Sequence, residues 1–318
     1  MIFVHDDPEF GDLLRIVAGQ RGLSPGLVEK DYWVTHSLWA LHDAGFDVWF
    51  KGGTSLSKGF GLIQRFSEDL DLKIEPGRVT GLRSVSNWKS AGTKAAAERQ
   101  ASFAALRDLL VVPGASVALE TSDPTWRNAE LRVIYPGRHL ADLANVLRPF
   151  VLLEVGSARV TPAVPRDLTS FVHEHLIAEG LLATFIDNTP KAVRCVHPLV
   201  TLLEKLDALH RRVPNEKVEP AAFVRHFEDA AHIIAAADTL PGLVEHADVV
   251  ALAKDMLAHR QLAALPASLD PAFAPDDAAR WSAIRITHAA IAPMFWGVRL
   301  PLETACAAIR AWLASEFT

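Results

Sequence analysis

Two aspartates that are two residues apart are the most suggestive chemical feature of this 318-residue sequence. Asp69 and Asp71 alternate with Leu70 and Leu72, and this alternation predicts a β-strand from 69 to 75. Because side chains two apart on a strand share a face, both carboxylates would point to the same side. Mg²⁺ commonly takes one or two protein carboxylates and leaves its other positions to water and phosphate oxygens. The pair therefore indicates a magnesium site, although an isolated Asp-x-Asp is more often an ordinary solvated strand face.

A glycine turn stands shortly before these aspartates. Residues 52–55, Gly-Gly-Thr-Ser, follow a strand predicted over 46–50 and precede a short helix predicted over 56–64. Backbone N–H groups at such a helix start can receive a phosphate. A Gly-Gly pair is usually only a turn, and this one is not a P-loop, since Gly-x-x-x-x-Gly-Lys-Ser/Thr is absent. Together with the aspartates, however, it fits a triphosphate held between glycine backbone and metal.

A third carboxylate interrupts an apolar run. Glu154 lies within 150–155, where an unpaired carboxylate would be costly to bury. On a strand next to the two aspartates it could bind a second metal or take the proton from an attacking hydroxyl. The alternative is a glutamate on an edge strand that faces solvent.

The elements that would position these residues form an α+β pattern. Strands are also predicted at 116–120, 129–135 and 150–155, which gives a mixed sheet of about five strands, and 76–100 is predicted to be a mobile excursion. Ser24 and Pro25 begin a helix that ends before Gly45. After Pro165 the pattern is helical, so we expect a core with N-terminal helices at 1–165 and a helical lobe at 166–318. The predicted helices of this second half are 167–179, 198–212, 220–237, 246–261, 276–291 and 301–315.

Two charged residues of the helical half stand out. Lys205 flanks an apolar stripe at helical spacing, and Asp229 lies four residues after Arg225. On pattern alone, the first is a lysine that reaches solvent and the second belongs to an ordinary intrahelical pair. The His173-Glu174-His175 triplet does not predict a zinc site, because two residues two apart on a helix face different ways.

The composition is that of an ordinary globular protein. Half of the residues are hydrophobic and 22% are charged, which excludes the disordered classes. The net charge of −6 argues against a protein that coats nucleic acid indiscriminately. Because the sequence has no membrane-spanning run, we expect a cytoplasmic protein without a membrane partner, and the distant Cys195 and Cys306 are predicted to be reduced thiols.

Longer stretches resemble a known family. Residues 52–58 (Gly-Gly-Thr-Ser-Leu-Ser-Lys) and 65–72 (Arg-Phe-Ser-Glu-Asp-Leu-Asp-Leu) closely resemble the first motif of the AbiEii/AbiGii family. These are MenT-like, nucleotidyltransferase-fold toxins of type IV bacterial toxin–antitoxin systems. The resemblance extends to 29–33, 204–209 and 225–229.

This resemblance implies a polymerase-beta-like nucleotidyltransferase core with a mixed sheet, followed by a C-terminal α-helical lobe. It adds Lys205 and Asp229 to the active site and makes Glu154 the third sheet carboxylate. The expected catalytic residues are Asp69, Asp71, Glu154, Lys205 and Asp229, of which Asp69, Asp71 and Glu154 bind metal. The expected nucleotide-binding residues are Gly52, Gly53, Thr54, Ser55, Lys58, Arg65 and Ser67.

The resemblance also implies the reaction. A nucleotide would pass from a nucleoside triphosphate to the 3′-end of an RNA such as tRNA, with Mg²⁺ or alternatively Mn²⁺, and a cognate antitoxin would be the protein partner. One rival is transfer to a protein hydroxyl, as in AMPylation. Another is a catalytically silent module that binds nucleotide or partner, which the intact Asp69 and Asp71 pair disfavours. An antitoxin-like DNA binder is disfavoured because no helix-turn-helix signal or basic face is present.

Overall fold

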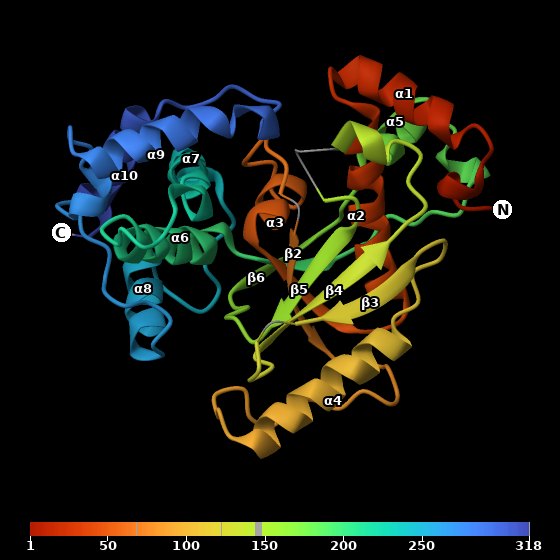
Figure 1. The fold of residues 1–318 in the computed structure, drawn as a ribbon, viewed down its shortest axis with the longest axis horizontal. Helices are drawn as coiled ribbons and strands as arrows, with labels where there is room; N and C mark the ends of the chain where they lie inside the picture. The colour runs from red at the N-terminus through yellow and green to blue at the C-terminus, as the bar shows by residue number, and fades with distance from the viewer. Residues whose placement is uncertain (68, 122, 144–147, 318) are drawn as a thin grey trace. The chain divides into compact units, whose positions relative to one another are not determined.

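The computed structural model describes residues 1–67, 69–121, 123–143 and 148–317 (Figure 1). The chain forms two compact units. The first comprises Met1–Gly59, Ser67–Val160 and Pro165–Cys195, and the second comprises Phe60–Phe66, Thr161–Val164 and Val196–Thr318. The boundary therefore crosses the chain several times, whereas the sequence suggested one cut near residue 165. Within the described ranges, no helix is long and apolar enough to cross a membrane.

A mixed sheet is the framework of the first unit. The described residues give seven strands in the order β3-β4-β5-β2-β1-β7-β6. The pair β2 and β5 and the pair β1 and β7 are parallel, whereas β1 with β2, β3 with β4 and β4 with β5 are antiparallel. The strands are β1 Asp47–Lys51, β2 Asp69–Glu75, β3 Ser116–Glu120, β4 Asn128–Ile134, β5 Val151–Gly156, β6 Ala163–Arg166 and β7 Val193–Val196.

The two faces of this sheet differ sharply in chemistry. The strand register places buried apolar residues together on one face, with Phe50 beside Leu72 and Leu70 beside Leu153. Since alternate side chains point to the other face, Asp69 and Asp71 share that opposite face, as the alternation in β2 predicts. The sheet therefore buries one side and presents charged groups on the other.

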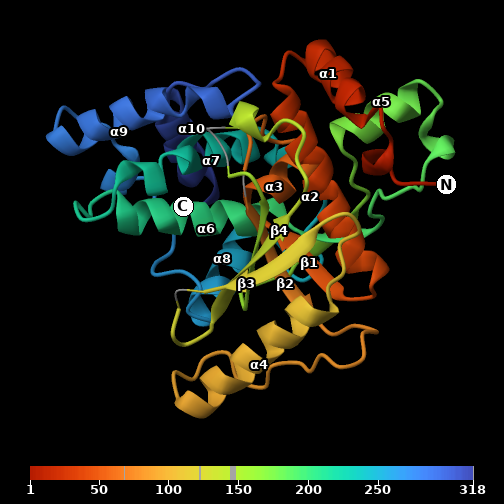
Figure 2. The same cartoon turned by 45° about the vertical axis from the view of Figure 1, so that its right-hand side comes forward.

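Helices of the first unit cover parts of this sheet. They are α1 Phe10–Arg21, α2 Pro25–Asp43, α3 Gly52–Lys58, α4 Thr93–Leu109 and α5 Phe171–Ala178. The side chain of Ser24 caps α2 by accepting from the N–H of Leu27, as predicted. α2 contacts β1 and β5, and α4 packs against β3 (Figure 2).

The buried polar residues at the start of α2 hold distant loops. Within the family-like stretch 29–33, three charged side chains each bond to backbone far along the chain. The bonds run to Glu29 from the N–H groups of Arg138 and His139 (both 2.8 Å), from Lys30 Nζ to the carbonyl of Arg148 (2.7 Å), and to Asp31 from the N–H of Phe171 (2.8 Å). These residues therefore position the loops around the sheet.

The second unit is largely helical. Its helices are α6 Pro198–Arg212, α7 Arg225–Ala235, α8 Val249–Ala258, α9 Ala279–Ala290 and α10 Leu302–Glu316. α7 packs against both α6 and α10, and α8 contacts α6. The segment Phe60–Phe66 joins this unit through the N–H of Phe66, which donates to the carbonyl of Met294 at 2.8 Å, and through the N–H of Trp296, which donates to Gln64.

The α+β prediction is confirmed, but several elements differ from it. Of the stretch 76–100, which was predicted to be a mobile excursion, residues 76–92 form no helix or strand, whereas 93–100 belong to α4, which begins at Thr93 and buries Phe103 and Leu106. The helix predicted over 56–64 instead occupies Gly52–Lys58. The sheet has more strands than expected, because β6 and β7 were not predicted. Each is only four residues long, which is too short for an alternation of polar and apolar residues to indicate a strand.

Candidate active site

A row of charged side chains crosses the polar face of the sheet. Lys51 of β1 pairs in register with Asp71 of β2, and Asp71 pairs with Glu154 of β5. Glu154 pairs with Glu130 of β4, and Glu130 pairs with Glu120 of β3. Directly paired residues lie on one face with close Cβ atoms, and like charges in such pairs repel. The sheet therefore holds four successive carboxylates beside one ammonium group.

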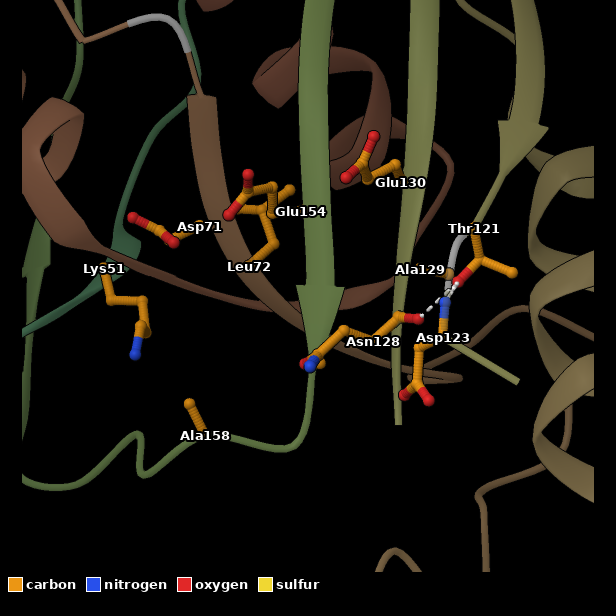
Figure 3. A pocket seen from close by; sticks show the side chains of 11 residues that line it. Lys51, Asp71, Leu72, Thr121, Asp123, Asn128, Ala129, Glu130, Glu154 and Ala158 are labelled. Atoms are coloured by element: carbon orange, nitrogen blue, oxygen red, sulfur yellow. Dashed lines mark hydrogen bonds between the residues drawn. The ribbon is translucent and has the colours of Figure 1, made fainter. Parts of the chain in front are cut away.

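A cavity of about 370 Å³ opens along most of this row. Figure 3 shows Lys51 and Asp71 at one end, Glu154 between, and Asn128 and Thr121 at the other end. Asp71 and Glu154 line the cavity from the neighbouring strands β2 and β5, and the Asp71 carboxylate lies against Gly52. A cavity of this size accommodates a small ligand or one unit of a larger one.

The carboxylate of Glu154 lies in an unfavourable environment. Burial raises its pKa first, and the charges of Asp69, Asp71 and Glu130 raise it further, to about 7, against a weaker opposing effect of Arg148. No residue within the described ranges donates a hydrogen bond or forms an ion pair with the carboxylate of Glu154 or of Glu130. The row is therefore electrostatically incomplete, and a cation or a hydrogen-bond donor would relieve it.

The glycine turn and the aspartates are in direct contact. Gly52 has a φ of +75°, and a Cβ at this position would overlap the carboxylate of Asp71. Only glycine adopts this conformation readily, and only glycine leaves room for the aspartate. The glycine turn and the aspartates are separated in the sequence, but they can pack against each other because residue 52 has no side chain.

Thr54 and Ser55 were expected to bind nucleotide, and their side chains make contacts within the protein. The hydroxyl of Thr54 donates to the backbone carbonyl of Asp69 at 2.8 Å, which fixes α3 to the start of β2. Ser55 is 1% exposed, so its hydroxyl faces the interior, and Gly53 is also buried. What this turn can offer a phosphate is the set of backbone N–H groups in the first turn of α3, which have no acceptor within the helix.

Lys58 is engaged elsewhere in the first unit. Its ammonium group pairs with Asp31 at 2.5 Å and donates to the carbonyl of Thr169 at 3.0 Å. Lys58 therefore ties α3 to α2 and does not line the cavity with Asp71. Ser67 is partly exposed, and its carbonyl accepts a long bond from Thr54 at 3.4 Å. Its neighbour Glu68, which belongs to the same motif, lies outside the described residues.

The donor set fits a hard divalent cation only in part. Asp69 and Asp71 share a face, and Asp69 accepts from Arg148 at 3.3 Å. Among the described residues, no group of three or more His, Cys, Asp or Glu side chains is arranged to ligate a metal. The crowded carboxylates nevertheless suit Mg²⁺ with one or two protein ligands, because its other positions go to water and phosphate.

The second unit brings together the other predicted catalytic residues with Arg65. Arg65 donates from Nε and Nη2 to the two carboxylate oxygens of Asp229, at 2.8 and 2.7 Å. Lys205 donates to Asp229 Oδ2 at 2.7 Å. Burial alone would raise the pKa of Asp229, but Arg65 and Lys205 hold it far below its usual range. Arg65 was expected to bind nucleotide, whereas its guanidinium is committed to this carboxylate.

The buried cluster of Arg65, Lys205 and Asp229 has two basic groups and one carboxylate, and so carries a net positive charge. Burial lowers the pKa of Lys205, and Asp229 opposes that effect. His226, which sequence reasoning missed, lies 3.4 Å from the Lys205 ammonium, and burial followed by Lys205 lowers its pKa strongly. His226 is therefore neutral, and the positive charge of the cluster comes from Arg65 and Lys205. Such a group attracts anions.

Comparison with protein families decides the membership of this chain. The model of the nucleotidyl transferase AbiEii toxin family, of type IV toxin–antitoxin systems, matches residues 40–308. The chain belongs to this family. Among curated proteins, the comparison found no match.

Two solved structures are similar over most of their length. MenT4, a nucleotidyltransferase toxin from Mycobacterium tuberculosis H37Rv, is 16% identical, with 95% of this chain and 98% of that chain covered and a TM-score of 0.39. JHP933 from Helicobacter pylori is 14% identical, with 89% and 91% covered and a TM-score of 0.31. Both TM-scores are below 0.5, so no functional argument rests on either structure.

Proposed function

We propose that this AbiEii-family protein transfers a nucleotide from a nucleoside triphosphate to the 3′-hydroxyl of an RNA, with tRNA as the expected acceptor. The observation that carries the proposal is the contact between Gly52 and the carboxylate of Asp71. It joins a potential phosphate-binding turn to a potential metal-binding carboxylate beside a cavity.

The triphosphate is assigned to the end of the cavity near Lys51. Lys51 and the backbone N–H groups at the start of α3 are the groups there that favour an anion. The remainder of the row is acidic and repels phosphate. Asp69 and Asp71 would hold Mg²⁺ or Mn²⁺, which, when bound, would neutralise phosphate charge and polarise the α-phosphate.

The chemical step is an in-line displacement at the α-phosphorus. The acceptor oxygen forms the new bond to phosphorus, the bond between the α-phosphorus and the bridging oxygen breaks, and pyrophosphate leaves. The proton of the acceptor hydroxyl passes to the carboxylate of Glu154. A carboxyl whose pKa is about 7 exchanges protons readily near neutral pH, which suits this role.

Lys205 and Asp229 enter the proposal through the likeness of 204–209 and 225–229 to the family. Lys205 would neutralise charge that develops on the phosphates. Asp229 would position Lys205 through their 2.7 Å bond, and Arg65 would fix Asp229 through its bidentate pair. Asp229 and Arg65 are thus positioning residues in this proposal.

The test supplies each α-labelled nucleoside triphosphate to total tRNA and to a mixture of cell proteins, with Mg²⁺. Label on tRNA from one or more nucleotides supports the proposal. Label on protein alone would overturn it in favour of AMPylation-type modification of protein hydroxyls. Label on neither acceptor would favour a module that binds nucleotide without turnover.

The family is one of toxin–antitoxin systems, so the proposal includes a cognate antitoxin as the protein partner. Modification of tRNA would stop translation, and a tRNA acceptor would place the reaction in the cytoplasm. The antitoxin would act by preventing or reversing this effect.

A further inference from the structure

The cavity extends well beyond the groups that the transfer reaction uses. Past Glu154 it is lined by Glu130 and Asn128 of β4 and by Thr121, which together we call the acidic end. In Figure 3 these residues lie on the far side of Glu154 from Lys51. They lie within the part of the chain that the family model matches, but outside the motifs at 52–58 and 65–72.

Charge determines which part of the reactants can occupy the acidic end. The register sets Glu130 beside Glu154, and no lysine or arginine of the described ranges lines this end of the cavity. A triphosphate carries about four negative charges and would be repelled by both carboxylates. The occupant must therefore be neutral or positive where it meets Glu130.

Unused hydrogen-bonding groups define that occupant further. Neither the carboxylate of Glu130 nor the side-chain amide of Asn128 bonds to any residue of the described ranges. Thr121, in contrast, is used: its hydroxyl donates to the carbonyl of Asn128 at 3.1 Å and accepts from the N–H of Asp123 at 3.1 Å. Two acceptor oxygens of Glu130 and both functions of the Asn128 amide thus remain for a ligand.

The position of the Asn128 side chain is itself constrained. A Cβ at Gly156 would overlap its amide oxygen, so the amide rests directly on the backbone of β5 where that strand ends. Glu154 lies two residues earlier on the same strand. The amide and both glutamates therefore border one continuous stretch of the cavity.

We infer that the acidic end binds the terminal ribose of the acceptor RNA through its vicinal 2′- and 3′-hydroxyls. Glu130 accepts from the 2′-hydroxyl, Asn128 contacts the ribose, and the 3′-hydroxyl remains beside Glu154. Adjacent hydroxyls are donors that a carboxylate satisfies well. This inference rests on the proposed function and adds to it a requirement for a free cis-diol at the RNA end.

The test compares Glu130→Gln with Glu120→Gln. Glu120 is the next member of the same row, but it pairs with Arg132 at 2.5 Å and does not line the cavity, so it is a matched control. Each protein is supplied with labelled nucleoside triphosphate and with tRNA that ends in either a normal ribose or a 2′-deoxyribose. The KM values for tRNA and for nucleotide are measured separately, and thermal melting confirms folding.

The parent and Glu120→Gln are expected to show a KM for deoxy-terminated tRNA about 10-fold above that for normal tRNA, as for one charged hydrogen bond lost. Glu130→Gln should raise the KM for normal tRNA about 10-fold, remove the preference for the diol, and leave the KM for nucleotide within about 2-fold.

Three results would overturn the inference. The parent could use both tRNA ends equally, or Glu130→Gln could raise the KM for nucleotide instead, which would assign Glu130 to the incoming base. In both cases RNA is still labelled, so the proposed function survives. Labelling of protein alone, with no RNA labelled, would overturn the inference and the proposed function together.

Discussion

At the scale of single residues, Glu154 is a carboxyl group whose charged form is disfavoured by its surroundings. Burial first, and then the charges of its neighbours, raise its pKa to about 7 from a reference of 4.5. Between these values the folded protein binds more protons than the unfolded chain, so stability falls as pH rises through that window. Above pH 7 the full cost of the charged form is present.

Glu154→Gln is therefore expected to be more stable than the parent at pH 8 when no metal is present. The full shift corresponds to about 3 kcal/mol, but Glu154 is only half-buried, so solvent screening reduces the expected gain to on the order of 1 kcal/mol. Urea unfolding in EDTA at pH 4.5 and pH 8 measures the difference. The difference in free energy of unfolding between Glu154→Gln and the parent should be larger at pH 8 than at pH 4.5. The same difference at both pH values would contradict this electrostatic account.

The sequence predicts which face of a strand a side chain occupies better than it predicts the ion-pair partner of that side chain. Alternation in β2 is enough to place Asp69 and Asp71 on one face, because side-chain direction follows from strand geometry. The partners of Lys58 and Arg65 are Asp31 and Asp229, far along the chain. Only the tertiary fold brings such charges together. The sequence motifs that contain Lys58 and Arg65 therefore led to the expectation that both bind nucleotide, and did not reveal these partners.

At the scale of elements, the junction of β1 and α3 depends on one glycine. Gly52→Ala would place a methyl group on the carboxylate of Asp71 and force a left-handed backbone on alanine. We expect loss of about 2 kcal/mol of folding free energy and a loss of transfer activity of at least about 100-fold.

The control for this variant is Gly19→Ala. Gly19 lies within α1, and a Cβ there would meet nothing within 4 Å. Alanine should stabilise that helix by about 0.5–1 kcal/mol and leave transfer activity unchanged. Full activity in Gly52→Ala would show that the contact with Asp71 is not required.

The contact between α6 and α7 gives a second prediction at this scale. Asp229→Asn leaves Arg65 and Lys205 buried with no counter-charge, whereas Lys205→Met leaves the Arg65 and Asp229 pair complete. Breaking a buried pair from one side costs about 3–5 kcal/mol. Asp229→Asn should therefore unfold at much lower denaturant than Lys205→Met, and the reverse order would contradict the charge balance described here.

Elements differ in how far sequence reveals them. α6 was predicted at its observed bounds, because its leucines recur at helical spacing and Pro198 begins it. α4 was missed because the residues before it are rich in Gly, Ser and Lys and because most of its apolar residues are alanines, with only Phe103, Leu106 and Leu109 as large apolar side chains. Glu154 was expected beside the two aspartates, but the other members of the charged row, Lys51, Glu130 and Glu120, were missed, since register between strands is a property of the sheet and appears in no single strand.

At the scale of the whole first unit, a buried histidine network joins its distant parts. Asn188 donates to Tyr32 and to His36 Nδ1, and its carbonyl bonds to His173 Nε2. His5 contacts the Tyr32 hydroxyl at 2.9 Å. Burial lowers the pKa of His36 to about 3, and it also lowers the pKa values of His5 and His173.

Acid should therefore loosen the first unit. Because the folded pKa of His36 is depressed, the unfolded chain binds more protons below about pH 6.5, and stability is lost as pH falls from there. At pH 5.5 the contribution of His36 is about 1.4 kcal/mol. His36→Gln should lower stability at pH 7.5 through its lost bonds but make the loss between pH 7.5 and 5.5 smaller by about this amount.

Tyr32→Phe is the matched control, since it removes hydrogen bonds of the same network without a group that titrates in this range. It should lower stability equally at both pH values, as followed by urea unfolding. If His36→Gln and Tyr32→Phe show the same pH dependence, proton uptake by His36 is not the cause.

The measurement that tests the central claim most directly compares Asp71→Asn with Asp47→Asn in transfer of α-labelled nucleotide to tRNA with Mg²⁺. Asp47 lies at the other end of β1 and is partly exposed, where it pairs with Arg194. The account predicts labelled tRNA with the parent and with Asp47→Asn, and at least about a 1,000-fold loss with Asp71→Asn. Equal labelling by both variants, or no labelled tRNA with the parent, would contradict it.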